Sequence, residues 1–250
     1  MFDIIPIAML KALYNFVLLA CLCPLFSYGL YPSPVDTVPQ LHLSVGSKKA
    51  GICFGNAPLY SGLRFNVVNS EVRRTNGLDV SVYNHDDKSD TEHTSNGISL
   101  AVIYNMVVIS NGISIGGILN LIGTENGIAI GGIANILDKQ NGISLSGMFT
   151  RVDTVNGLAI SLCALTSMDF KKHNNRVNGV AIAGWLLNLS QVNGIALAAM
   201  NKSEVLRGVS IGVYNKSEKL RGIQVGLFNI AENNPRLFRR LPFFNMHLRK

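Results

Sequence analysis

Two segments of the sequence have the spacing of a serine nucleophile. Residues 112–116 and 208–212 both match Gly-x-Ser-x-Gly, the pattern that exposes the reactive serine of many hydrolases on a strand-to-helix turn. The position of Ser114, however, is filled by Ala129 and Gln224 in other copies of the same repeat. We therefore interpret both serines as repeat positions, and we predict that the protein is not an enzyme and has no catalytic residues.

A polar insert contains side chains that could bind a hard cation. Asp86, Asp87, Asp90 and Glu92 would supply carboxylate oxygens for such an ion. The glycine-centred ligand spacing of calcium loops is missing, so a solvated loop is the favoured interpretation, and the four acids are kept only as candidate metal ligands. No glycine-rich stretch is followed by the Lys-Ser/Thr pair of a phosphate loop, and we expect no cofactor.

The N-terminus predicts export. Lys11 precedes an apolar run over residues 12–22, and small residues follow within 27–29. A positive charge, a short apolar segment and a small-residue exit are the features of a cleaved signal peptide. We expect residues 1–29 to be removed, which would place the protein outside the bacterial cytoplasm.

Two properties of this signal stay open. Residues 18–21 read Leu-Leu-Ala-Cys, which is a lipobox, so lipidation of Cys21 is an alternative to ordinary cleavage. The apolar residues that follow Cys21 favour ordinary cleavage. Translation starts at Met1 or at Met9, because Asp3 is unusual at the beginning of a signal.

The strands that would position these side chains come from a tandem repeat, in which a glycine is followed by aliphatic residues at alternate positions. Ile113 and Ile115 point to one side of a strand and Ser114 to the other, because the side-chain period of a strand is two. The spacing is 14 or 15 residues, apart from two longer polar inserts. The eleven repeat glycines are Gly62, Gly77, Gly97, Gly112, Gly127, Gly142, Gly157, Gly179, Gly194, Gly208 and Gly222. The sequence therefore predicts an all-β fold.

Two architectures fit a strand and a turn in every unit. In an antiparallel meander, about 11–14 short strands close into an outer-membrane-type β-barrel. In a β-solenoid, each unit of 14–15 residues is one coil. A strand that runs unbroken over residues 222–229 covers about 26 Å, and about six residues are too few to return from its end. This length favours the barrel, and the solenoid is the alternative, provided that the strand breaks near the second glycine.

The placement of charge also favours the barrel. Between residues 97 and 148 the charged side chains are Glu125, Asp138 and Lys139, all in expected turns. A soluble solenoid needs a wettable outer face, whereas a barrel turns its aliphatic side chains to lipid and its small ones to the lumen. Aromatic residues near strand ends fit a barrel as well: Tyr83, Tyr104, Phe149, Tyr214 and Phe228. The two long inserts favour the solenoid instead, because they follow units of opposite parity and a meander would place them at opposite rims.

Composition and charge narrow the class of protein further. The chain has 250 residues, of which 48% are hydrophobic and 15% charged, with 24 Gly and 4 Cys, which excludes disorder, collagen and a disulfide scaffold. Residues 201–250 hold ten Lys and Arg against three Glu, and the remainder is balanced. Such a basic end could attract lipopolysaccharide or anionic lipid, although solvated turn residues are the plainer interpretation, and we expect no nucleic-acid partner. The expected segments are a signal peptide (1–29), a lead-in with one or two strands (30–61) and a β-repeat domain (62–250).

The C-terminal quarter resembles a bacterial surface-repeat family of uncharacterised role. Residues 207–215, 221–232 and 241–245 carry the likeness to its units, which read Gly-aliphatic-Gln-aliphatic-Gly-Leu-aliphatic-Asn. Residues 62–200 match more loosely, with Ser or Ala in place of Gln. The resemblance implies an exported surface or envelope protein and supplies no catalytic residues.

Together these features lead to one expected function and two alternatives. We expect a structural or pore-like protein of the bacterial outer membrane or cell surface, with outer-membrane lipid or lipopolysaccharide as its partner. A secreted or surface-attached β-solenoid adhesin or scaffold is the alternative. A hydrolase is a distant third.

Overall fold

The protein is described by a computed structural model over residues 42–47, 49–70, 72–85, 93–166 and 175–248, which belong to one compact unit, Gln40–Lys250. The expected export signal, the candidate lipidation site Cys21, and the candidate metal ligands Asp86, Asp87, Asp90 and Glu92 lie outside the described residues. Those predictions therefore stay predictions.

The described residues form strands and turns without a helix. The strands are β1 (His42–Ser47), β2 (Ala50–Gly55), β3 (Leu59–Asn69), β4 (Arg74–Asn84), β5 (Thr94–Gly116), β6 (Leu119–Gly131), β7 (Ala134–Ser146), β8 (Phe149–Ser161), β9 (Ala164–Thr166), β10 (Arg176–Ala183), β11 (Leu186–Leu197), β12 (Met200–Ile211), β13 (Tyr214–Ala231) and β14 (Arg240–His247). The all-β prediction is confirmed.

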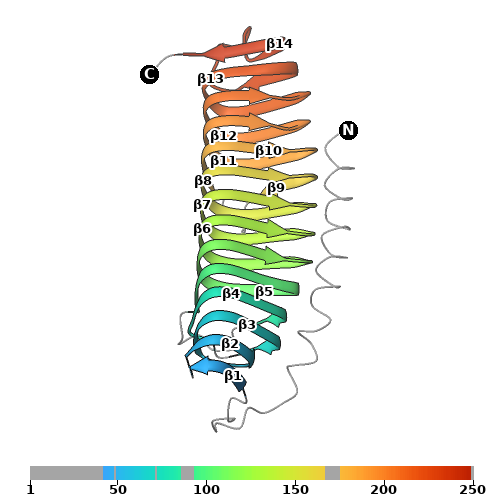
Figure 1. The fold of residues 1–250 in the computed structure, drawn as a ribbon. Coiled ribbons are helices and arrows are strands. Elements are labelled where there is room, and N and C mark those ends of the chain that lie inside the picture. The colour runs from blue at the N-terminus through green and yellow to red at the C-terminus, as the bar shows by residue number, and fades with distance from the viewer. Residues whose placement is uncertain (1–41, 48, 71, 86–92, 167–174, 249–250) are drawn as a thin grey trace, which may run out of the picture. The chain divides into compact units, whose positions relative to one another are not determined.

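The architecture is a parallel β-solenoid of stacked coils (Figure 1). Strands from β2 to β13 pair in parallel, and each repeat position lies beside the same position of the next repeat: Gly112 pairs with Gly127, and Gly127 with Gly142. The favoured barrel prediction is wrong, because a meander requires antiparallel neighbours, and the solenoid alternative is confirmed. Antiparallel pairing occurs at the two ends, where β1 lies against β2 and β14 against β13.

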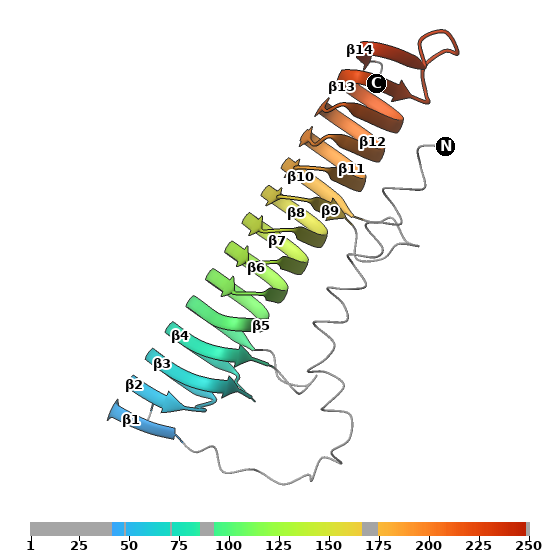
Figure 2. The ribbon, with the colours of Figure 1, turned by 90° about the vertical axis from the view of Figure 1, so that its right-hand side faces the viewer.

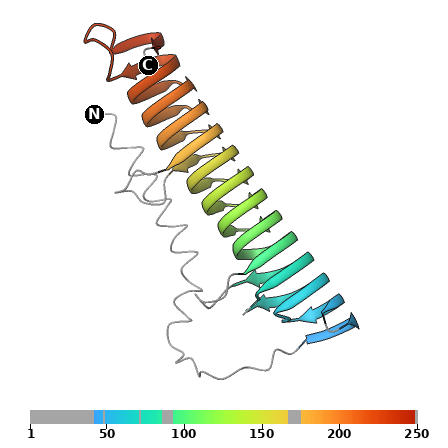
Figure 3. The same cartoon turned by 90° about the vertical axis from the view of Figure 1, so that its left-hand side faces the viewer.

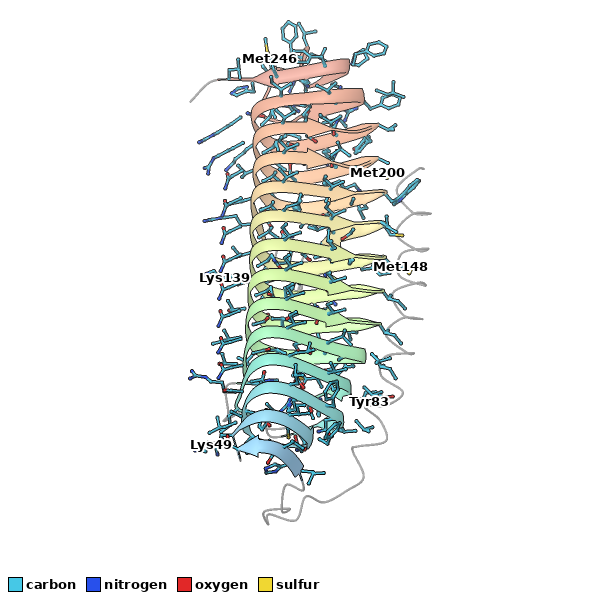
Figure 4. The ribbon with its side chains drawn as sticks, in the orientation of Figure 1. Lys49, Tyr83, Lys139, Met148, Met200 and Met246 are labelled. Carbon is cyan, nitrogen blue, oxygen red and sulfur yellow. The ribbon has the colours of Figure 1, made fainter. Side chains whose placement is uncertain are left out.

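Each coil is flattened, with two strand faces joined at two edges (Figures 2 and 3). The edge that carries turns such as residues 117–118 is here called the turn edge, and Met148 and Met200 lie along it (Figure 4). At the opposite edge, here called the asparagine edge, the strand bends without a break, and Lys49 and Lys139 lie there. These bends return the chain within 14–15 residues, which a straight strand cannot do.

Glycine at the asparagine edge is required by the backbone. Gly112 has a φ of +144°, and a Cβ at this residue would lie 2.1 Å from the carbonyl oxygen of Gly97 in the preceding coil. L-residues rarely adopt such a conformation, and the space is already filled by backbone. The Asn-Gly signature of the repeat is therefore the place where every coil bends.

The interior is narrow and lined by columns of small, amide and aliphatic side chains, the last including Leu137 and Val152. Along one strand face, the buried column runs through Ser99, Ser114, Ala129, Ser144 and Ala159. Along the other, buried asparagines stack and donate amide hydrogen bonds between coils, as from Asn105 to Asn120 at 3.0 Å and from Asn201 to Asn215 at 2.8 Å. The small side chains explain why the two faces approach closely, and the amide ladder satisfies polar groups inside.

Candidate interaction surfaces

One outer face of the solenoid carries two columns of apolar side chains, here called the apolar face. It alternates with the buried Ser/Ala column, so the predicted period of two is confirmed, with aliphatic side chains outside and small ones inside. The first column is Leu63, Leu78, Ile98, Ile113, Ile128, Ile143, Leu158, Val180, Ile195, Val209 and Ile223, and the second is Phe65, Val80, Leu100, Ile115, Ile130, Leu145, Ile160, Ile182, Leu197, Ile211 and Val225.

The apolar face is open to solvent in the single chain. Ile98, Ile195 and Ile211 are 39%, 42% and 41% exposed, and the remaining positions are half-buried or exposed. A soluble monomer rarely exposes more than a few hundred Å² of contiguous apolar surface, and two columns over eleven repeats exceed that amount. The face therefore has the character of an interaction surface.

The end strands continue the apolar face. On β1 and β2, Val45 and Ile52 extend the first column, because they pair with each other and Ile52 pairs with Leu63. On β14, Met246 pairs with Ile223 in the same way. The remaining end residues of the face are Leu43, Phe54 and Phe244, and the Phe54 ring stacks on Phe65 with centroids 5.6 Å apart. The end strands thus close the stack without interrupting the apolar surface.

The turn edge is apolar as well. Its most exposed side chains include Leu162 (69%), Trp185 (50%) and Val213 (52%). The aromatic residues that the sequence placed near strand ends lie along it in one column, from Tyr83 and Tyr104 through Phe149 to Tyr214 and Phe228. The apolar surface therefore continues from the apolar face around one edge of the solenoid.

The remaining sides carry the polar and charged side chains of the exterior. At the asparagine edge the exposed or half-exposed amides form a ladder, in which Asn126 donates to Asn111 at 2.8 Å and Asn141 to Asn126 at 2.7 Å, and Arg207 and Arg221 continue the column. The second strand face, here called the mixed face, has apolar residues such as Met106 and Leu121 at its outward positions in β5 and β6. From β7 onward the outward positions include charged residues: Asp138, Arg151, Asp153, Lys202, Glu204, Lys216, Glu218 and Glu232. The solenoid is thus amphipathic around its circumference.

A buried ion pair fills the interior near the N-terminal end. Arg64 donates from Nε to Oδ1 of Asp79 at 2.9 Å and from Nη2 to Oδ2 at 2.7 Å, and both residues are 1% exposed. Asn69 donates to Oδ2 of Asp79 at 3.0 Å, and Nη1 of Arg64 donates to the carbonyl of Ala57 at 2.9 Å. Buried His93 lies in the field of this pair, and burial, with Arg64 acting in the same direction, lowers its pKa to about 4.

A second buried charge site is Glu125. Its side chain points inward between Ser110 and Gln140 of the neighbouring coils, and the residue has no exposed surface. Burial raises the pKa of Glu125 to about 7, although the hydroxyls of Ser114 and Ser110 act in the opposite direction. Neither carboxyl oxygen has a hydrogen-bond partner among the described residues. Glu125, Asp138 and Lys139 were all expected in turns. Asp138 and Lys139 are exposed, whereas Glu125 faces the interior because it occupies an inward position of the bend.

The two serine motifs lie in straight strands. Ser114 is fully buried and its hydroxyl donates to Ser110 at 2.6 Å, and Ser210 is 2% exposed and donates to Asn215 at 2.7 Å. A hydrolase elbow needs an exposed hydroxyl on a strand-to-helix turn, which is a different geometry. Over the described ranges no three His, Cys, Asp or Glu residues gather as metal ligands would, and no helix is long and apolar enough to cross a membrane.

Face assignment leads to a first prediction. Ala129→Asp is expected to destabilise the fold by roughly 3 kcal/mol or more, because it places a charge in the closed interior. Ile128→Asp, one residue away but pointing outward, is expected to cost about 1 kcal/mol through lost strand propensity. Urea unfolding followed by circular dichroism, in dilute solution so that single copies unfold, measures both. Ala129→Ser is the control and is expected to be tolerated, since Ser114 and Ser144 occupy the same column; equal losses for the two aspartates would contradict the assignment.

The fold and its surfaces define a β-solenoid repeat protein with an amphipathic exterior. Searches against protein-family models, curated proteins and solved structures returned no match. What the chain does must therefore be inferred from its own surfaces.

Proposed function

We propose that the protein is a non-enzymatic scaffold of the bacterial cell surface, exported from the cytoplasm and associated with other envelope components through its apolar exterior. The observation that carries this proposal is the continuous apolar face, which is exposed along the whole stack, whereas charged side chains lie on the other sides, mainly from β7 onward. The buried serines support the non-enzymatic part, since their hydroxyls are enclosed by the fold.

The turn edge is the part of this exterior that we expect to contact outer-membrane lipid or lipopolysaccharide. Trp185 and Phe228 are aromatic side chains of the kind enriched at membrane interfaces, and Leu162 is an exposed aliphatic side chain in the coil next to that of Trp185. The basic residues Arg207 and Arg221 lie at the opposite, asparagine edge, so the expected contact of the turn edge rests on its apolar and aromatic side chains.

Trp185 provides a direct test, because it is the single tryptophan of the chain. We expect its fluorescence maximum to shift to shorter wavelength when the full chain meets vesicles that contain lipopolysaccharide, since the half-exposed indole would leave water. Leu162→Asp, which puts a charge beside it on the turn edge, is expected to weaken vesicle binding about tenfold or more. The matched control is Ile136→Asp on the mixed face, for which binding is expected to stay unchanged. If the Trp185 emission maximum does not change when vesicles are added, and the wild-type protein is recovered in the soluble cell fraction, the proposed function is contradicted.

A further inference from the structure

We propose that two copies of the protein pack apolar face against apolar face as an antiparallel two-fold dimer. The proposal rests on the proposed function, because it specifies how the scaffold assembles. It assigns the apolar face to a second copy and leaves the turn edge for the lipid.

The size of the apolar face suits a stable dimer. Neighbouring rungs of a sheet lie about 4.8 Å apart, so the face measures about 60 Å from β1 to β14, and two outward columns with their flanks span about 12 Å. Two such faces would bury about 1,500 Å² in total, which is the size of a standard specific protein interface.

The composition of the apolar face suits another sheet better than lipid. All positions of its two repeat columns are apolar and most are aliphatic, and Phe65 is the one aromatic residue among them. Lipid-binding surfaces carry aromatic and basic anchors at their margins. On the apolar face aromatic residues occur at the two ends of the stack, at Phe54, Phe65 and Phe244, whereas along the stack they lie on the turn edge. Stacked sheets interdigitate their side chains about 10 Å apart, and two copies with the same rung spacing match each other along their whole length.

Charge and edge placement select the antiparallel orientation. Two-fold axes in the interface plane allow two arrangements: an axis along the solenoid gives parallel copies with their turn edges on opposite sides, and an axis across it gives antiparallel copies with their turn edges on the same side. The antiparallel arrangement also separates the basic C-terminal quarters, residues 201–250, of the two copies. It places the axis between the rungs of Ile128 and Ile143 and presents both turn edges to one lipid surface.

Sedimentation equilibrium of the full chain tests the dimer. We expect wild type to sediment as a dimer, and Ile128→Lys to raise the dimer dissociation constant about 100-fold or more, because each lysine would be buried without a partner. The matched control is Ile136→Lys, a half-buried isoleucine of the next strand, β7, on the mixed face, and it is expected to stay dimeric. Thermal unfolding checks that both variants fold, and Ile195→Lys, at a residue 42% exposed, replaces Ile128→Lys if that variant does not.

Cross-linking of the native chain tests the orientation. Lys49 lies on the asparagine edge (Figure 4), and Lys219 lies there too, because the strand register places it in the column of Lys139. The two are near opposite ends of the stack, about 55 Å apart within one copy by the rung spacing. In the antiparallel dimer Lys49 of one copy lies opposite Lys219 of the other, so a short amine-reactive cross-linker should join them. Parallel copies would place their asparagine edges on opposite sides of the dimer, so a dimer that gives no Lys49–Lys219 cross-link between copies would overturn the antiparallel arrangement.

The outcomes separate this inference from the proposed function. A monomeric wild-type chain overturns the dimer, and if Trp185 still responds to vesicles the envelope scaffold stands without it. Loss of vesicle binding in Ile128→Lys, with an unchanged monomeric state, would assign the apolar face to lipid and likewise overturn the dimer. Failure of both the vesicle response and dimerisation would remove the proposed function together with the inference.

Discussion

Replacing Arg64 by methionine is expected to lower the free energy of unfolding by about 3–5 kcal/mol. The substitution removes both charge-assisted hydrogen bonds to Asp79 and leaves a carboxylate, 1% exposed, with Asn69 as its remaining donor partner. Breaking one partner of a buried ion pair has this cost because the other charge stays desolvated. Urea unfolding at pH 7, followed by circular dichroism, measures the loss.

Two further variants show whether the loss of stability comes from the buried Asp79 carboxylate that Arg64→Met leaves unpaired. Lys216→Met breaks the exposed pair with Glu232, whose atoms lie 3.1 Å apart, and is expected to cost at most about 1 kcal/mol. The double variant Arg64→Ser/Asp79→Ser introduces the residue that Ser99 and Ser114 already place in the same inward column, and we expect it to be more stable than Arg64→Met. If Arg64→Met and Lys216→Met lose the same stability, the buried pair is not the source.

The sequence was informative about what is periodic. The spacing of the glycines predicted the repeats, and the alternation around Ser114 predicted strands with one aliphatic and one small side. Both follow from local rules that hold for any strand, and both are confirmed. Neither depends on which strands pair.

The choice between barrel and solenoid depended on two assumptions that the structure contradicts. A strand over residues 222–229 was treated as straight, whereas the coil bends at each repeat glycine and at the turn edge. A solenoid was also expected to have a wettable outer face, yet the outward aliphatic columns are apolar along the whole stack. The parity of the two inserts was the better signal, because the chain leaves the coil after Asn84 and after Thr166, which lie on the same strand face.

The interior charges could be found only by aligning the repeats. Arg64 and Asp79 stand where many other units have Ser or Ala, and this replacement is the sequence signal of an interior charge. Glu125 offered no such signal, because its position at the bend is filled by Ser110 and Gln140 in the neighbouring units, and polar residues suit a turn as well as an enclosed ladder. Its burial is a consequence of how the coils stack.

Glu125→Gln is expected to raise the free energy of unfolding by about 3 kcal/mol at pH 8 and to leave it nearly unchanged at pH 4. In the folded chain the pKa of Glu125 is about 7, against 4.5 for the ordinary group. The stability that comes with the bound proton is complete below pH 4.5 and is lost as the pH rises to 7, because the unfolded chain releases the proton first. A difference of about 2.5 pKa units corresponds to about 3 kcal/mol, and glutamine, which Gln140 already provides one coil away, removes this dependence.

The contribution of His93 to stability changes with pH in the opposite direction to that of Glu125. Measuring both contributions gives the most discriminating test. The pKa of His93 is about 4 in the folded chain against 6.5 ordinarily, so its contribution falls as the pH drops from 6.5 to 4. In wild type the two slopes oppose each other between pH 4.5 and 6.5. Glu125→Gln leaves the histidine slope alone, so the stability of this variant is expected to rise from pH 4 to 6.5 and then to level off. Urea unfolding at pH 4, 5, 6, 7 and 8 measures this dependence of stability on pH. The control is Glu218→Gln, at an exposed residue, which should follow wild type. If Glu125→Gln also follows wild type, the Glu125 carboxyl is not enclosed as described.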